Sequence, residues 1–195
     1  MIHGLLLAAG ESKRLGQAKQ LLQIQDKSLL EWAALALLQT CDEVSVVLGA
    51  ERKGCLSIVK NLQHEYENLH LIISSDYGEG MGSTLSEGLR KIGNHQHVLV
   101  HLVDMPYING FHLKYLINHF QKNTSLALVS NYEGQNAPPV IIPQQLLSMF
   151  YDWRGEMGLG AFWKQHPDLV DRLELGVPYQ DIDTIEDWEK IKEQF

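Results

Sequence analysis

Short apolar runs alternate with helix-like stretches along the chain, and this alternation limits the fold more than any other feature. The runs are rich in β-branched residues, which is typical of strands covered on both faces. Strands are expected at 3–9, 44–48, 69–73, 98–103 and 126–130, and helices near 29–39, 52–62, 83–92 and 110–121. A βαβα order predicts a three-layer α/β/α fold with a mainly parallel sheet and right-handed crossovers.

The segment from Asn131 to Pro143 departs from this alternation. Glu133-Gly134-Gln135-Asn136 has the composition of a turn, and Pro138-Pro139 would interrupt a central strand because proline cannot donate a ladder hydrogen bond. We therefore expect a small edge hairpin here.

Two capping boxes mark helix starts: Ser28-x-x-Glu31 and Thr184-x-x-Asp187. The second predicts a last helix that ends near Gln194. Because the sequence shows no linker or internal repeat, residues 1–195 are expected to form a single domain.

Charge and cysteine content narrow the class of protein. The chain has 24 acidic against 16 basic residues, which disfavours a nonspecific nucleic-acid binder. Cys41 and Cys55 lack metal-site spacing and are expected to be reduced thiols of a cytoplasmic protein. No run approaches the roughly 18 apolar residues of a membrane span. Neither nucleic acid nor a membrane is therefore an expected partner.

The first expected strand runs directly into a basic loop bounded by Gly10 and Gly16. Glycine permits backbone conformations that are closed to other residues, and Arg14 and Lys19 can reach phosphate oxygens. The spacing does not fit the P-loop pattern GxxxxGK[ST], and the GxGxxG dinucleotide fingerprint is absent. The loop therefore predicts a different kind of phosphate site.

Four motifs follow one another along the chain. The loop reads LxxAAGxSxRxGxxKxLL over 5–22, and later segments are Gly80-Met81-Gly82-Ser83-Thr84-Leu85, Val103-Asp104-Met105-Pro106 and Asp181-Ile182-Asp183-Thr184-x-x-Asp187. Together they resemble the molybdenum cofactor cytidylyltransferase branch of the molybdopterin nucleotidyltransferase-like (NTP transferase) family. The AAG form of the loop favours the cytidylyl branch.

The resemblance implies a Rossmann-like nucleotidyltransferase domain over 1–195. Such an enzyme would transfer CMP from CTP to molybdopterin, release pyrophosphate and require Mg²⁺. Its partners would be CTP, a phosphorylated small-molecule acceptor, and a molybdoenzyme or maturation factor. The implied nucleotide-binding residues are Leu7, Ala8, Ala9, Gly10, Ser12, Arg14, Lys19, Gly80, Gly82 and Ser83. The implied catalytic residues are Arg14, Lys19 and Asp104, and the implied metal ligands are Asp104 and Asp183.

The residue types suit this chemistry. Nucleotidyl transfer accumulates charge on phosphoryl oxygens, so catalysis is mostly positioning and electrostatic stabilisation by groups such as Arg14 and Lys19. Mg²⁺ binds one or two carboxylates together with water and substrate oxygens. Asp104 and Asp183 are far apart in sequence, so their convergence is a prediction of the fold. Asp181 could be the second ligand in place of Asp183.

Each motif also has a purely structural interpretation. The basic residues of the first loop could be solvated, and Asp104 could belong to a turn. Thr184 could only cap the last helix, and the segment 78–83 could be a glycine-rich loop without a ligand. His95, His97 and His101 lack the spacing of a zinc site and are expected to be structural.

The acceptor half departs from the family pattern. Asn136-Ala137-Pro138-Pro139 lacks the usual glycine, and 155–162 retains an acidic residue, Glu156, but no arginine. The acceptor could therefore be a sugar phosphate or another phosphorylated compound. Two further classes of protein stay open, a non-catalytic escort protein and a dinucleotide-dependent redox enzyme. Trp153 and Trp163 are expected to pack in the core, although either could border the acceptor pocket instead.

Overall fold

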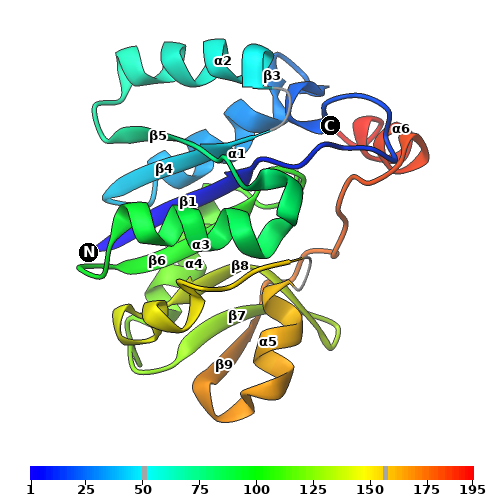
Figure 1. Cartoon of the computed structure of the whole chain (residues 1–195). Helices are drawn as coiled ribbons and strands as arrows, with labels where there is room; N and C mark the ends of the chain where they lie inside the picture. Colours follow the sequence, from blue (N-terminus) through cyan, green and yellow to red (C-terminus); the bar gives the residue numbers. More distant parts are fainter. Residues whose placement is uncertain (50–51, 156–157) are drawn as a thin grey trace.

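The computed structural model describes residues 1–49, 52–155 and 158–195, and its main sheet has the strand order β5-β4-β1-β6-β8-β7-β9 (Figure 1). The strands of this sheet are β1 (Ile2–Ala8), β4 (Glu43–Leu48), β5 (Leu69–Ile73), β6 (His97–Leu102), β7 (Ala127–Tyr132), β8 (Gln135–Ile142) and β9 (Val170–Glu174). The helices are α1 (Leu29–Leu38), α2 (Arg52–Glu65), α3 (Met81–Ile92), α4 (Gly110–Phe120), α5 (Leu159–Gln165) and α6 (Ile185–Lys192). A separate small hairpin pairs β2 (Gln23–Ile24) with β3 (Lys27–Ser28).

The main sheet is covered on both faces, as the alternating pattern predicts. Alternate residues of β1 point to opposite faces: Leu6 belongs to a core cluster with side chains of α1, α2 and α4, whereas Leu5 and Leu7 pack with side chains of α3 and α5. The pairs β1-β4, β1-β6, β4-β5 and β7-β9 are parallel. The structure thus confirms the three-layer, mainly parallel α/β fold.

The register of β1 and β6 positions the candidate site. Leu7 lies opposite Leu102 in this parallel pair, and the backbone N–H of Val103 donates to the Leu7 carbonyl at 3.3 Å. The loop after β1 and Asp104 after β6 therefore emerge at the same edge of the sheet, the carboxyl end, where open α/β sheets bind ligands.

The hairpin formed by β7 and β8 lies inside the sheet, so the expectation of an edge hairpin is wrong. β8 is antiparallel to both β6 and β7. Only Val140–Ile142 pair with β6, so Pro138 and Pro139 lie beyond that ladder. Their carbonyls accept hydrogen bonds from Tyr132 Oη at 2.7 Å and Ser130 Oγ at 2.6 Å. The two prolines are the extra residues of β8 where the β7-β8 register shifts. The prolines are tolerated because their missing N–H groups are not needed there.

The expected strands and the first four helices are present, with ends that differ by a few residues. Both capping boxes also form, at Ser28 and Thr184. The short elements β2, β3, α5 and β9 were not predicted because their apolar patterns are brief. Cys41 and Cys55 are buried free thiols.

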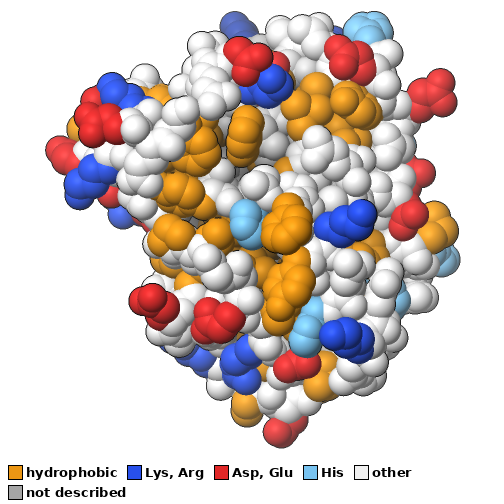
Figure 2. Space-filling view, turned by 180° about the vertical axis from the view of Figure 1, so that it is seen from behind, with side chains coloured by type: hydrophobic (Ala, Val, Ile, Leu, Met, Phe, Trp, Pro, Cys, Tyr) orange, Lys and Arg blue, Asp and Glu red, His pale blue; other side chains and the backbone are white. Residues whose placement is uncertain are grey.

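The surface carries mixed charge. On the face shown in Figure 2, Lys and Arg side chains are interspersed with Asp and Glu and do not form one broad basic field. Among the described residues, no helix has the length and apolar character needed to cross a membrane.

Candidate active site

The loop after β1 is held open by its own hydrogen bonds. Ser12 has φ +53° and Gly16 has φ +73°, and the carbonyl of Ser12 accepts hydrogen bonds from the N–H groups of Leu15 and Gly16, each at 3.1 Å. Ser12 Oγ also accepts from the backbone N–H of Lys19 at 3.1 Å. These bonds set the curvature of the loop before any ligand binds.

Gln20 fastens this loop to the sheet. Its fully buried side chain donates through Nε2 to the carbonyls of Ala8 at 3.0 Å and Gly10 at 2.8 Å. Sequence reasoning missed this role, although a glutamine directly after the motif lysine within an apolar stretch was a usable signal. Gln20 therefore positions the backbone where the loop after β1 begins.

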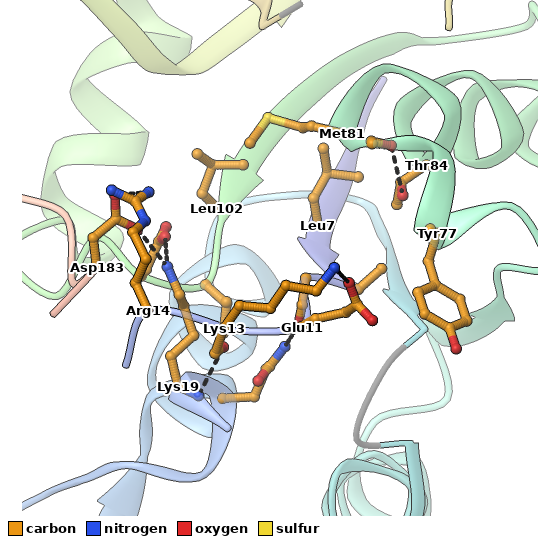
Figure 3. A pocket seen from close by; sticks show the side chains of 18 residues that line it. Leu7, Glu11, Lys13, Arg14, Lys19, Tyr77, Met81, Thr84, Leu102 and Asp183 are labelled. Atoms are coloured by element: carbon orange, nitrogen blue, oxygen red, sulfur yellow. Dashed lines mark hydrogen bonds and ion pairs between the residues drawn. The ribbon is translucent and has the colours of Figure 1, made fainter. Parts of the chain in front are cut away.

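A charged cluster joins three of the sequence motifs, as Figure 3 shows for Lys19, Arg14 and Asp183. Lys19 Nζ lies 2.7 Å from Asp104 Oδ2 and 3.1 Å from Asp183 Oδ1. Arg14 Nη2 lies 2.6 Å from Asp183 Oδ2. The predicted convergence of Asp104 and Asp183 is therefore observed, with Lys19 between them.

The centre of the cluster is withdrawn from solvent, whereas the side chains of Arg14 and Asp183 are 72% and 31% exposed. The side chains of Lys19 and Asp104 are 12% and 15% exposed. Burial by itself lowers the pKa of Lys19, but the charges and hydrogen bonds of Asp104 and Asp183 outweigh burial and raise the pKa above its ordinary value. The ammonium group thus stays charged at neutral pH.

The cluster has the donors that a divalent cation needs. Asp104 Oδ1 is buried and has no hydrogen-bond partner among the described residues. Such an orphaned carboxylate oxygen carries a desolvation cost that a cation would remove. With Asp183 beside it and phosphate oxygens as further ligands, Asp104 fits a Mg²⁺-type site of few carboxylates.

Two cavities meet at this cluster. The first has a volume of about 330 Å³ and extends from the loop after β1 to Tyr77 and Met81. The second has a volume of about 830 Å³ and extends toward the tip of the β7-β8 hairpin and the start of α5. The residues that line both are Leu7, Arg14, Lys19, Met81, Leu102, Asp104 and Asp183. The charged cluster is therefore the wall between two adjoining chambers.

Most of the predicted site residues lie at the first cavity. Those that line it are Leu7, Ala9, Gly10, Ser12, Arg14, Lys19, Gly80, Asp104 and Asp183. Gly82 lines only the second cavity, and Ala8 and Ser83 line neither. Ser83 is buried, and its hydroxyl donates to Glu79 Oε2 at 3.3 Å. The structure therefore does not place Ser83 with the other predicted nucleotide-binding residues.

Asp181 lies apart from the four-residue ion-pair network of Arg14, Lys19, Asp104 and Asp183. It lines only the second cavity, where its Oδ2 accepts a hydrogen bond from Tyr179 Oη at 3.1 Å. Burial, followed by the charges of Asp104 and Asp183, raises its pKa. Lys19 contacts Asp104 and Asp183 but forms no ion pair with Asp181, and Asp183 as the second metal ligand stays a prediction.

The remaining predicted residues have structural positions. Trp163 is fully buried, and Trp153 packs so closely on Gly82 that a Cβ added there would lie 2.4 Å from the indole. Neither tryptophan lines either cavity. His101 is fully buried, and Glu156 lies outside the described residues.

The segment before α5 is docked on the start of α3. The backbone N–H of Gly82 donates to the Gly155 carbonyl at 2.9 Å, and Arg154 Nη1 lies 2.9 Å from Glu79 Oε2. The glycine-rich motif at 80–85 therefore holds the segment before α5 in place and also lines the first cavity.

Comparison with known proteins identifies relatives along nearly the whole chain. Residues 4–170 match the MobA-like NTP transferase domain family. Nicotine blue oxidoreductase of Paenarthrobacter nicotinovorans is 30% identical over 95% of this chain and 93% of its own length. The purine catabolism protein PucB of Bacillus subtilis (strain 168) is 25% identical over 97% and 95%. The crystal structure of the Rv0371C complex with manganese from Mycobacterium tuberculosis H37Rv superposes with a TM-score of 0.77 at 20% identity, covering 100% and 99% of the two chains.

Proposed function

We propose that this chain, which belongs to the MobA-like NTP transferase domain family, transfers CMP from CTP to molybdopterin and releases pyrophosphate. Membership of that family makes the chain a nucleotidyltransferase. The identity of the nucleotide and of the acceptor is the content of the proposal.

One observation carries the proposal: Lys19, Arg14, Asp104 and Asp183 form the wall shared by two adjoining cavities. Nucleotidyl transfer needs two phosphorylated substrates whose reacting groups meet at one charged centre. The first cavity adjoins the phosphate loop and is suited to the triphosphate. The second is large enough for a ring-bearing acceptor.

The side chains of the cluster supply the electrostatics of the reaction. The acceptor phosphate attacks the α-phosphorus of the nucleotide in line, and pyrophosphate leaves with the bonding electrons. Arg14 and Lys19 exchange their carboxylate contacts for contacts with phosphate oxygens and so neutralise the charge that develops there. A bound divalent cation, Mg²⁺ in our proposal, would be held by Asp104 and Asp183 and would stabilise charge on the phosphate oxygens.

The choice of CTP and molybdopterin is supported by the motif resemblance. The AAG form of the first loop favours the cytidylyl branch, and the four motifs appear in the order of the molybdopterin nucleotidyltransferases. A product of this kind would be delivered to a molybdoenzyme, directly or through a maturation factor, and such a protein is the expected partner.

A pyrophosphate-release assay tests the proposal. The chain is incubated with Mg²⁺, molybdenum-loaded molybdopterin and CTP, GTP, ATP or UTP, and the expected result is release with CTP above the other nucleotides. Release with a sugar phosphate in place of molybdopterin would contradict the acceptor, and binding without turnover would indicate an escort protein.

An oxidoreductase is the second candidate function, because the 30%-identical relative is named nicotine blue oxidoreductase. An arm with NADH and NADPH, followed by absorbance of the reduced nicotinamide, tests it. Consumption of the reduced nicotinamide without any pyrophosphate release would contradict the proposed function and indicate an oxidoreductase.

A further inference from the structure

We infer that Asp181, held in place by Tyr179, selects the acceptor by accepting hydrogen bonds from the N–H edge of an uncharged planar heterocycle. This inference rests on the proposed function, because it assumes that the second cavity receives the acceptor. It assigns to Asp181 a role in specificity rather than in metal binding.

The pair formed by Tyr179 and Asp181 is anchored from behind. Tyr179 Oη donates to Asp181 Oδ2 at 3.1 Å, and the ring of Tyr179 packs on that of Tyr132 with centroids 5.5 Å apart. Tyr132 is in turn fixed by its hydrogen bond to the Pro138 carbonyl at 2.7 Å. A carboxylate supported in this way is preorganised, and preorganisation reduces the cost of binding.

The carboxylate of Asp181 can still accept a hydrogen bond from a ligand. Tyr179 engages Oδ2, and among the described residues no Lys, Arg or His forms an ion pair with Asp181. Its neighbours Asp104 and Asp183 are already contacted by Lys19. A half-buried carboxylate in a cavity gains most from a donor group, because an unpaired charge there is costly.

The acceptor phosphate is an unsuitable partner for Asp181, because two anions would repel each other. The phosphate belongs at Arg14 and Lys19, where the two cavities meet. The remainder of the acceptor must then supply the donor groups for Asp181, and the pterin of the proposed acceptor supplies them as N–H groups.

The walls of the second cavity suit a flat ring. Apolar side chains from the sheet and from one helix layer line part of it, with Leu85 from α3, Val100 from β6, Pro138 from β8 and Leu159 from α5. Polar side chains such as Gln135 and Asn136 line the remainder. A planar heterocycle needs apolar faces and a few polar groups at its edge, and this cavity offers both. An aminopyrimidinone edge, as in a pterin, offers adjacent N–H donors to one carboxylate, a charge-assisted arrangement.

Fluorescence titration with 6-hydroxymethylpterin and with 6-hydroxymethyllumazine tests the inference without turnover. The lumazine replaces the exocyclic amino group of the pterin by an oxygen, so it should bind at least about tenfold more weakly, the value of a charge-assisted hydrogen bond. Asp181→Asn should weaken pterin binding about tenfold or more and abolish the preference over lumazine. Tyr179→Phe should cause a smaller loss in the same direction, whereas Asp168→Asn, an exposed carboxylate in the turn before β9, should match the wild type.

A guanosine titration separates the acceptor from the donor base, because guanine has the same edge. Guanosine binding that depends on Asp181, without pterin binding, would overturn the inference. An unchanged pterin affinity in a folded Asp181→Asn variant would also overturn it. The same holds if this variant has a changed Mg²⁺ requirement but an unchanged KM for the acceptor. If the wild type binds pterin through Asp181 but releases no pyrophosphate with any nucleotide, the proposed function fails and the specificity role stands.

Discussion

Replacing Lys19 by Met should lower turnover by about a hundredfold to a thousandfold. Lys19 Nζ lies within 2.7 Å of Asp104 and 3.1 Å of Asp183, and its side chain is 12% exposed, so the charge is poorly screened. Two unit charges about 4 Å apart at an effective dielectric constant of about 20 interact by about 4 kcal/mol. Loss of one preorganised electrostatic group costs about 3 to 4 kcal/mol in comparable sites, which corresponds to a turnover lower by about a hundredfold to a thousandfold.

The substitution should also change how the site binds cations. Without the ammonium group, Asp104 and Asp183 face each other, and among the described residues Arg14 is the basic side chain that still pairs with one of them, Asp183. We expect the Lys19→Met variant to be less stable than the wild type in the presence of a chelator and to recover stability when Mg²⁺ is added, because a cation then neutralises the two carboxylates.

Pyrophosphate release under saturating CTP measures the first effect, and urea unfolding with and without Mg²⁺ measures the second. Lys27→Met is the matched control: its side chain is 38% exposed and paired with Asp26 on the small hairpin, so its loss should leave turnover unchanged. A folded Lys19→Met variant with a turnover near that of the wild type would refute the electrostatic reasoning.

Further predictions concern the metal site, acid stability and the docking of the acceptor-side segment. Asp104→Asn should lower turnover at least about a hundredfold and raise the Mg²⁺ concentration for half-maximal rate, as checked by metal titration; an unchanged titration would remove Asp104 from the metal site. Burial lowers the pKa of His101 to about 3 from 6.5, so below pH 6.5 only the unfolded chain takes up this proton and stability falls with falling pH. At pH 5 this lowers the free energy of unfolding by about 2 kcal/mol relative to pH 7.5. In urea unfolding, the free energy of the His101→Leu variant should fall less between these two pH values, by the same amount. Gly82→Ala should lower the free energy of unfolding by about 2 kcal/mol, because its Cβ would lie 2.4 Å from Trp153 and 2.8 Å from a backbone oxygen, whereas Gly158→Ala, whose Cβ meets nothing within 4 Å, should cost little.

The motif resemblance is not spread evenly between the two cavities. The loop after β1, the cluster around Lys19 and the segment around Gly80 carry the family motifs. The second cavity is bordered by the hairpin tip and by the start of α5, and the resemblance is weaker in these regions because the glycine and arginine that it leads us to expect are absent. Substrate differences among relatives are therefore expected to reside in the second cavity.

Local signals in the chain were enough to predict the layered fold and the irregular loop that follows its first strand. Apolar runs with strand period, the capping boxes at Ser28 and Thr184, and the glycine spacing of the first loop each depend on residues close together in sequence. The same kind of signal failed at Pro138 and Pro139, because whether a proline is tolerated depends on which strand segment lies beside it. Local rules predict an edge position there, but the ladder with β6 ends before the prolines.

Tertiary packing places the charged residues where they line both cavities. The convergence of Asp104 with Asp183 requires β6 and the approach to α6 to meet at one edge of the sheet, and no spacing in the chain encodes the distance. The same holds for Gln20, which fastens the loop through backbone carbonyls, and for Tyr179, which holds Asp181 in the second cavity. Contacts between residues far apart in sequence are set by packing and register, so the chain predicts the chemistry of its site more readily than the partners of each group.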